Sequence, residues 1–154
     1  MPKIRNLTML GTGYVGLVSG TCFAEVGFNV TCVDLDTPKF RALKSKGAIP
    51  IHEPGLEELV ARNVKAGRLH FTTKMSEAIP EADAVFIAVG TPQDEDGSAD
   101  LSHVQAAAKQ IAPMMKGYTV IINKSTVPVG TGALVEKLIR KVNPKADFDV
   151  VSNP

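Results

Sequence analysis

Three glycines near the N-terminus have the spacing of a phosphate-binding turn. They lie in the segment Gly11-Thr12-Gly13-Tyr14-Val15-Gly16, between the apolar stretch Leu7–Leu10 and a stretch with helical periodicity. In that position the first glycine allows a tight turn, the second lets a pyrophosphate approach the backbone, and the third brings the helix close to the strand. The segment therefore predicts a dinucleotide site at a helix N-terminus, whose unpaired N–H groups face the phosphates.

Two other interpretations of this glycine-rich segment compete with a dinucleotide site. A P-loop requires Lys followed by Ser or Thr after the second spaced glycine, and this chain has Leu17 and Val18 there, which argues against an ATPase. A glycine turn without any ligand remains the alternative, and the preceding strand and following helix favour the dinucleotide site over it.

An acidic residue stands where a dinucleotide's adenosine ribose is expected. Asp34 follows the stretch Asn29–Val33 and lies 18 residues after Gly16, close to the spacing of about 20 at which a carboxylate reaches the ribose hydroxyls. Its charge would repel a 2′-phosphate, so the sequence favours NAD over NADP. Asp36 competes for this role from the following turn, and Lys39 is a candidate contact on the adenosine side.

Two later segments are expected at the carboxyl ends of strands, where open α/β sheets bind ligands. They are Val89-Gly90-Thr91-Pro92 and the stretch Lys124–Gly130, which contains Ser125 and Thr126. Each combines a hydroxyl residue with Pro and Gly, which predicts a rigid loop with backbone donors facing the cofactor. An ordinary turn is the alternative for both, and Thr126 is also a candidate helix cap.

The other reactive side chains show no pattern typical of catalysis or metal binding. The three histidines share no zinc spacing, and the acidic loop Asp94–Asp100 does not match a calcium-binding loop. Cys22 and Cys32 lie in apolar stretches, so we expect two buried, unreactive thiols in a reducing compartment. We expect no metal.

Composition limits the partners and the location. The 154 residues carry a net charge of +1, so we expect no nucleic-acid or anionic-membrane partner. The longest apolar run, Ala84–Val89, is far shorter than the roughly 20 residues of a membrane span. The N-terminus lacks the apolar stretch of a signal peptide. We therefore expect a cytoplasmic protein.

The elements that must hold these residues alternate between short apolar runs and helical stretches, as in a parallel α/β sheet. Six strands are predicted: Leu7–Leu10, Asn29–Val33, Leu69–Thr72, Ala84–Val89, Thr119–Asn123 and Phe148–Ser152. Further helices are predicted at Pro38–Lys46, Gly55–Ala66, Leu101–Met115 and Thr131–Val142. We expect one doubly wound, Rossmann-type domain over residues 1–154 with strand order 3-2-1-4-5-6.

The helix after the glycine turn is expected to pack on the sheet through Val15, Val18, Cys22 and Val26, which recur at helical spacing. Gly27 is placed to end it. The polar segment Gly90–Asp100 is expected to form a surface loop.

Five segments in order along the chain resemble the NAD-binding domain of the nucleotide-sugar 6-dehydrogenases. They are Gly11–Gly20, Val33–Asp36, Ile51–Leu56, Ala88–Pro92 and Lys124–Gly130. The likeness covers essentially the whole chain and is greatest to the bacterial UDP-glucose 6-dehydrogenases. Dehydrogenases of GDP-mannose or UDP-N-acetylmannosamine are the alternatives within the family, and a non-catalytic NAD-sensing module is the alternative outside it.

This resemblance implies an enzyme that oxidises the sugar C6 alcohol twice, reduces two NAD and hydrolyses a cysteine thioester. It implies NAD contacts at Val15, Asp34, Lys39, Thr91 and Thr126, and an auxiliary role for Thr126 toward the hydrolytic water. In the family, a linker helix and a second domain follow, and that domain carries the catalytic cysteine. We therefore expect this chain alone to be inactive, and the complete family enzyme to be a homo-oligomer that uses UDP-glucose.

Overall fold

The computed structural model describes residues 3–154 as six strands, five α-helices and three short 3-10 helices. The strands are β1 (Asn6–Leu10), β2 (Asn29–Val33), β3 (Leu69–Thr72), β4 (Ala84–Ile87), β5 (Thr119–Asn123) and β6 (Phe148–Ser152). The α-helices are α1 (Tyr14–Glu25), α2 (Pro38–Lys46), α3 (Leu56–Lys65), α4 (Ser102–Ile111) and α5 (Thr131–Val142). The 3-10 helices are η1 (Met75–Glu77), η2 (Ile79–Glu81) and η3 (Ala112–Met114).

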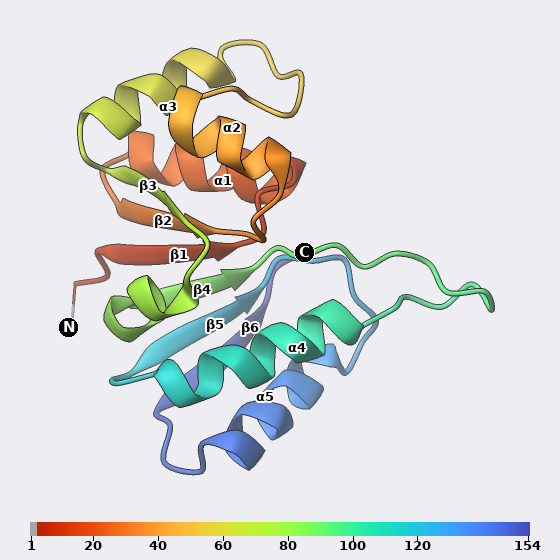
Figure 1. The fold of residues 1–154 in the computed structure, drawn as a ribbon. Helices are drawn as coiled ribbons and strands as arrows, with labels where there is room; N and C mark the ends of the chain where they lie inside the picture. The colour runs from red at the N-terminus through yellow and green to blue at the C-terminus, as the bar shows by residue number, and fades with distance from the viewer. Residues whose placement is uncertain (1–2) are drawn as a thin grey trace.

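The strands form one parallel sheet in the order β3-β2-β1-β4-β5-β6, which confirms the predicted strand number and order. Helices α1, α2 and α3 cover one face, and α4 and α5 cover the other (Figure 1). Because all strands run the same way, their carboxyl ends meet at one edge of the sheet (Figure 1). The chain reverses its direction of winding between β1 and β4, which is where ligands bind in this architecture.

The core has two layers because side chains alternate along each strand. On β1, Met9 packs with α1, α2 and α3, whereas Leu10 packs with the cluster that includes α4 and α5. The same alternation places Val85 and Ala84 of β4 in different clusters. Both faces of the central strands are therefore apolar, as the nearly continuous apolar runs predicted. Within residues 3–154, no helix has the length and apolarity needed to cross a bilayer.

Helix α1 contacts the sheet through Leu17 and several small residues, and of the four predicted positions only Val18 packs against the core. Its buried positions are Gly16, Leu17, Gly20, Thr21 and Ala24, whereas Val15, Cys22 and Val26 are exposed. A Cβ atom at Gly20 would lie 3.0 Å from Met9 Cγ and 3.1 Å from Cys32 Sγ. The glycines therefore let the helix axis approach β1 and β2 closely, and Val15 and Val26 are left exposed. Gly27 follows the helix with φ +108°, as predicted.

Most predicted boundaries agree with the structure to within a residue, and two do not. Strand β4 ends at Ile87 instead of Val89, because the Ile87 carbonyl accepts the N–H groups of both Lys124 and Ser125 as the chains diverge. Helix α4 ends at Ile111, and the remainder of the predicted helix is η3. Pro113 lies in η3 and lacks the N–H group that would continue an α-helix.

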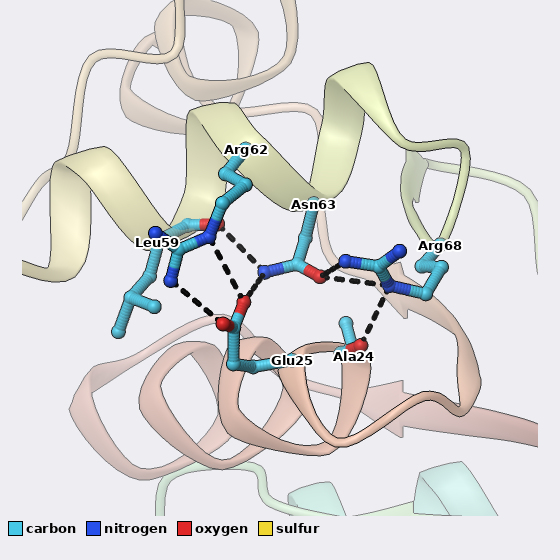
Figure 2. A network of polar contacts seen from close by, with 6 residues as sticks. All are labelled: Ala24, Glu25, Leu59, Arg62, Asn63 and Arg68. Atoms are coloured by element: carbon cyan, nitrogen blue, oxygen red, sulfur yellow. Dashed lines mark hydrogen bonds and ion pairs between the residues drawn. The ribbon is translucent and has the colours of Figure 1, made fainter.

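A buried amide joins α1, α3 and the turn before β3 (Figure 2). The Asn63 side chain is fully buried. Its Nδ2 donates to Glu25 Oε2 at 2.6 Å and to the Leu59 carbonyl at 2.9 Å. Its Oδ1 accepts from Arg68 Nε at 3.1 Å and Nη2 at 2.9 Å. All of the amide's main hydrogen-bonding positions are thus satisfied inside the protein.

Two arginines extend this network at the end of α1 (Figure 2). Arg68 Nε also donates to the Ala24 carbonyl at 2.9 Å, in the last turn of the helix. Arg62 Nη2 lies 2.6 Å from Glu25 Oε1, and hydrogen bonds from Arg62 and then Asn63 lower the pKa of the Glu25 carboxyl. Because the pKa of Glu25 is lower in the folded protein, the hydrogen bonds to its carboxylate stabilise the fold above the ordinary carboxyl pKa. This stabilisation is lost as the pH falls through the folded-state pKa of Glu25.

We predict that Asn63→Ala lowers the free energy of unfolding by about 1–3 kcal/mol, because partly buried donors and acceptors lose their partner. The measurement is urea unfolding at pH 7. Asn29→Ala is the matched control, since the Asn29 side chain is exposed and such changes stay within about 0.5 kcal/mol. Equal effects of the two substitutions would contradict the assigned role of Asn63.

Candidate functional site

The glycine turn holds α1 against two strands at distances that only glycine permits. Gly11 has φ +101°, and a Cβ atom there would lie 2.4 Å from the Ala88 carbonyl oxygen, just after β4. A Cβ atom at Gly16 would lie 2.0 Å from the Gly11 carbonyl oxygen. Both positions confirm the tight turn and the close helix packing that the spacing predicted.

Gly13 differs from these two glycines because it faces open space. It is the N-cap residue of α1, with φ −67°, and no side chain caps the helix there. A Cβ atom at Gly13 would have no neighbour within 4 Å. The fold therefore does not require glycine at this position, and the first turn of α1 presents its backbone N–H groups without a capping side chain. This is the arrangement of an anion site at a helix N-terminus.

Asp34, at the end of β2, is turned toward the glycine turn. Its Oδ2 accepts hydrogen bonds from Thr12 N at 2.6 Å and Thr12 Oγ1 at 2.5 Å, and its Oδ1 accepts one from Leu35 N at 2.7 Å. Asp36, the competing acidic residue, is exposed and pairs with Arg41 at 3.6 Å. The geometry therefore favours Asp34 as the carboxylate beside the turn. Sequence reasoning named Thr12 only as part of the turn and missed its side-chain contact.

Hydrogen bonds join the loops that follow β4 and β5. Thr91 Oγ1 donates to the Thr126 carbonyl at 3.0 Å, and Ser125 Oγ donates to the Val89 carbonyl at 2.7 Å. Ser125 is buried and Thr126 is exposed, so only the second presents its side chain at the surface of this edge. The helix-cap alternative for Thr126 was wrong, because the N-cap residue of α5 is Gly130.

The remaining predicted contact residues lie around the same edge. Val15, in the first turn of α1, is 46% exposed, and Lys39 is exposed in the first turn of α2. Gly90 and Pro92 are exposed in the loop after β4. That loop extends away from the sheet to α4 (Figure 1), as expected for the polar segment. The structure thus gathers side chains from four loops at the β1–β4 switch point.

A contact from the loop before α3 was not expected. Tyr14 Oη donates to Glu53 Oε2 at 2.5 Å, which raises the pKa of the Tyr14 hydroxyl above its ordinary value. Glu53 also lines a surface hollow of about 510 Å³, which is formed by residues 48, 49, 51–55, 57 and 58. None of the glycine-turn residues lines this hollow, and the Tyr14–Glu53 hydrogen bond connects the two. The only sequence signal for Glu53 was its place in the segment Ile51–Leu56, one of the five that carry the family resemblance.

The cysteines and the acidic loop take no part in the site. Burial, and then the nearby Asp34 charge, raise the pKa of the Cys32 thiol to about 12, which leaves it protonated and unreactive. Cys22 is exposed, so its predicted burial was wrong. In the acidic loop, Asp96 accepts from Ser98 N and Oγ, and these bonds lower the pKa of Asp96. That carboxylate orders its own loop.

Comparison with known proteins agrees with this geometry. A family model described as the UDP-glucose/GDP-mannose dehydrogenase family, NAD binding domain, matches residues 5–154. The UDP-glucose 6-dehydrogenase of Rhizobium meliloti (strain 1021) is 60% identical over 150 residues, which cover 97% of this chain and 34% of the relative. UDP-glucose 6-dehydrogenase TuaD of Bacillus subtilis (strain 168) is 55% identical over 152 residues, which cover 98% and 33%. The chain spans about a third of the length of these relatives.

Two solved structures share the fold closely. A UDP-glucose dehydrogenase from Pyrobaculum islandicum superposes with a TM-score of 0.91 at 39% identity, over 99% of this chain and 36% of that one. A GDP-mannose dehydrogenase from Pseudomonas aeruginosa superposes with a TM-score of 0.91 at 33% identity, over 97% and 36%.

We predict that Gly16→Ala lowers the free energy of unfolding by about 1–3 kcal/mol, because the added methyl group overlaps a backbone carbonyl that cannot rotate away. Gly13→Ala serves as the control, since its methyl group meets no protein atom. Urea unfolding of both variants checks the difference. A Gly16→Ala protein as stable as the control would contradict the close contact of Gly16 with Gly11.

Proposed function

This chain belongs to the UDP-glucose/GDP-mannose dehydrogenase family, whose NAD-binding domain it forms, and we propose that it serves a UDP-glucose 6-dehydrogenase. The complete enzyme would oxidise UDP-glucose twice at C6 to UDP-glucuronate and reduce two NAD. The observation that carries the proposal is the glycine turn at the β1–β4 switch point with Asp34 beside it. The 60% and 55% identities to named UDP-glucose 6-dehydrogenases support the choice of substrate.

The residues at this edge fit the chemical parts of NAD. The open backbone at Gly13 and the uncapped start of α1 suit a pyrophosphate. The Asp34 carboxylate suits the adenosine ribose hydroxyls and disfavours a 2′-phosphate. We assign Tyr14, Val15 and Lys39 to the same half of the cofactor from their positions in the first turns of α1 and α2.

The joined loops after β4 and β5 would hold the nicotinamide half. When bound, NAD supplies the hydride acceptor for oxidation of the sugar carbon. Thr91 fixes the backbone of Thr126 by its hydrogen bond, and Ser125 fixes that of Val89. These contacts keep the exposed Thr126 hydroxyl at one place on the edge, where family resemblance assigns it to NAD and, as an auxiliary group, to the hydrolytic water. Gly90 and Pro92 belong to the loop after β4, which contains Thr91.

Two alternative functions, a different nucleotide sugar as substrate and a non-catalytic NAD-sensing role, have less support. The GDP-mannose dehydrogenase structure superposes as well as the UDP-glucose enzyme, so the fold alone does not choose the sugar, and the sequence identities favour UDP-glucose. A non-catalytic NAD-sensing module has no need of the loop that carries Thr126. We also propose a cytoplasmic, homo-oligomeric enzyme whose linker helix and catalytic domain form the other two thirds of the protein, in keeping with the longer relatives.

We predict that Gly13→Ala weakens NAD binding by at least about 10-fold in a protein that stays folded, because its methyl group enters the space assigned to the pyrophosphate. Titration calorimetry with NAD and a melting curve give the two readouts. Unchanged affinity in a folded variant would place the diphosphate elsewhere.

A second prediction concerns activity. This chain mixed with NAD and UDP-glucose should produce no NADH, because residues 3–154 present no activated thiol beside the glycine turn and the family's catalytic cysteine belongs to its second domain. Absorbance at about 340 nm follows the reaction. Steady NADH formation by the purified chain, abolished by Gly13→Ala, would refute the division of labour proposed for this enzyme.

A further inference from the structure

We propose that Thr12 is a positioning residue that selects NAD over NADP by fixing the Asp34 carboxylate. The inference rests on the proposed NAD site and adds to it a role for a residue whose own side chain faces away from solvent. Thr12 is 7% exposed although both glycines beside it are more accessible. Its hydroxyl is directed to Asp34 Oδ2 at 2.5 Å, so it is occupied inside the protein.

The Asp34 carboxylate is held by three donors. Two come from Thr12, through its N–H and its hydroxyl, and the third comes from Leu35 N. A carboxylate has about four lone-pair positions, so these contacts leave roughly one for an incoming ribose hydroxyl. They also fix the direction in which that position points. The ribose therefore meets a carboxylate whose orientation is already set, which lowers the entropy cost of binding.

All three donors are neutral, and this preserves the charge on which selection depends. Asp36 pairs with Arg41 at 3.6 Å, whereas no ion pair to Asp34 occurs within residues 3–154. A hydroxyl and two amides orient the carboxylate without neutralising it. In the part of the chain that the structure describes, no cationic side chain therefore offsets the repulsion between the Asp34 carboxylate and a 2′-phosphate, which disfavours NADP.

The same contacts join the two halves of the site that bind the adenosine and the phosphates. Thr12 lies between Gly11 and Gly13, and its N–H donates to the carboxylate at the end of β2. Gly11 N also donates to the Val33 carbonyl at 2.9 Å, one residue before Asp34. The turn and the carboxylate thus form one hydrogen-bonded unit. Among the described residues, the Thr12 hydroxyl is the only side-chain group that donates to the Asp34 carboxylate.

The test compares Thr12→Val with Thr12→Ser, because valine removes the hydroxyl at constant shape and serine keeps it. We expect Thr12→Val to weaken NAD binding by roughly 5- to 20-fold and to reduce the ratio of NAD to NADP affinity. Thr12→Ser should stay within about twofold of the unchanged protein. Titration calorimetry with both dinucleotides measures the affinities, and melting curves verify folding. Thr12→Ala replaces the valine variant should the latter not fold, with the same expectation.

A double-mutant cycle separates positioning from a purely structural role. If Thr12 acts through Asp34, then Thr12→Val has no further effect in an Asp34→Ala background, where NAD is already bound about 10- to 100-fold more weakly. Equal losses in both backgrounds, or an unchanged NAD to NADP ratio in Thr12→Val, would overturn the inference while leaving the NAD site intact. Failure of the unchanged protein to bind NAD would instead overturn the proposed function.

Discussion

The close approach of α1 to β1 and β4 is the contact on which the site depends. Gly16 lies against the Gly11 carbonyl, and Gly11 lies against the Ala88 carbonyl, at distances that exclude any side chain. Farther along the helix, Gly20 maintains the approach over Met9 and Cys32. Because of this packing, the start of α1 lies at the carboxyl edge of the sheet, with its N–H groups toward the switch point. Larger residues here would move the helix outward, and the Asp34 carboxylate would then lose its contact with Thr12.

Hydrogen bonds between the loops then connect the carboxyl ends of neighbouring strands into one continuous surface. Thr12 joins the glycine turn to the end of β2, and Thr91 and Ser125 join the loops after β4 and β5. Each bond links segments that are distant in the chain, and each fixes the position of a backbone group in one of these loops. Preorganisation of this kind suits a domain whose proposed task is to orient a cofactor, because a bound group then meets donors and acceptors that are already in place.

Sequence predicted the sheet well because its strands are buried on both faces and therefore appear as continuous apolar runs. It failed on most of the face of α1, where apolar periodicity selected Val15, Cys22 and Val26. The contact instead uses Leu17 together with the small residues Gly16, Gly20 and Ala24. Periodicity detects bulky side chains, and a contact made by small residues leaves no such signal. The same limit applies to Thr12 and Glu53. Their partners lie 22 and 39 residues away in the chain, and no local pattern specifies which polar groups meet across a fold.

The carboxyl edge of the sheet carries exposed apolar side chains and one unpaired buried amide, neither of which contributes to stability. Leu35 is 77% exposed beside Asp34, and Val15 is 46% exposed in the first turn of α1. Asn123, at the end of β5, is fully buried, and among residues 3–154 it holds the only buried side-chain polar atoms without a protein partner. An unpaired buried amide is unfavourable by about 1–3 kcal/mol. The opposite end of α1, in contrast, is closed by the satisfied network around Asn63. Local conflicts of this kind concentrate at functional sites in folded proteins, and the unpaired Asn123 amide is in keeping with the proposed location of the site at this edge.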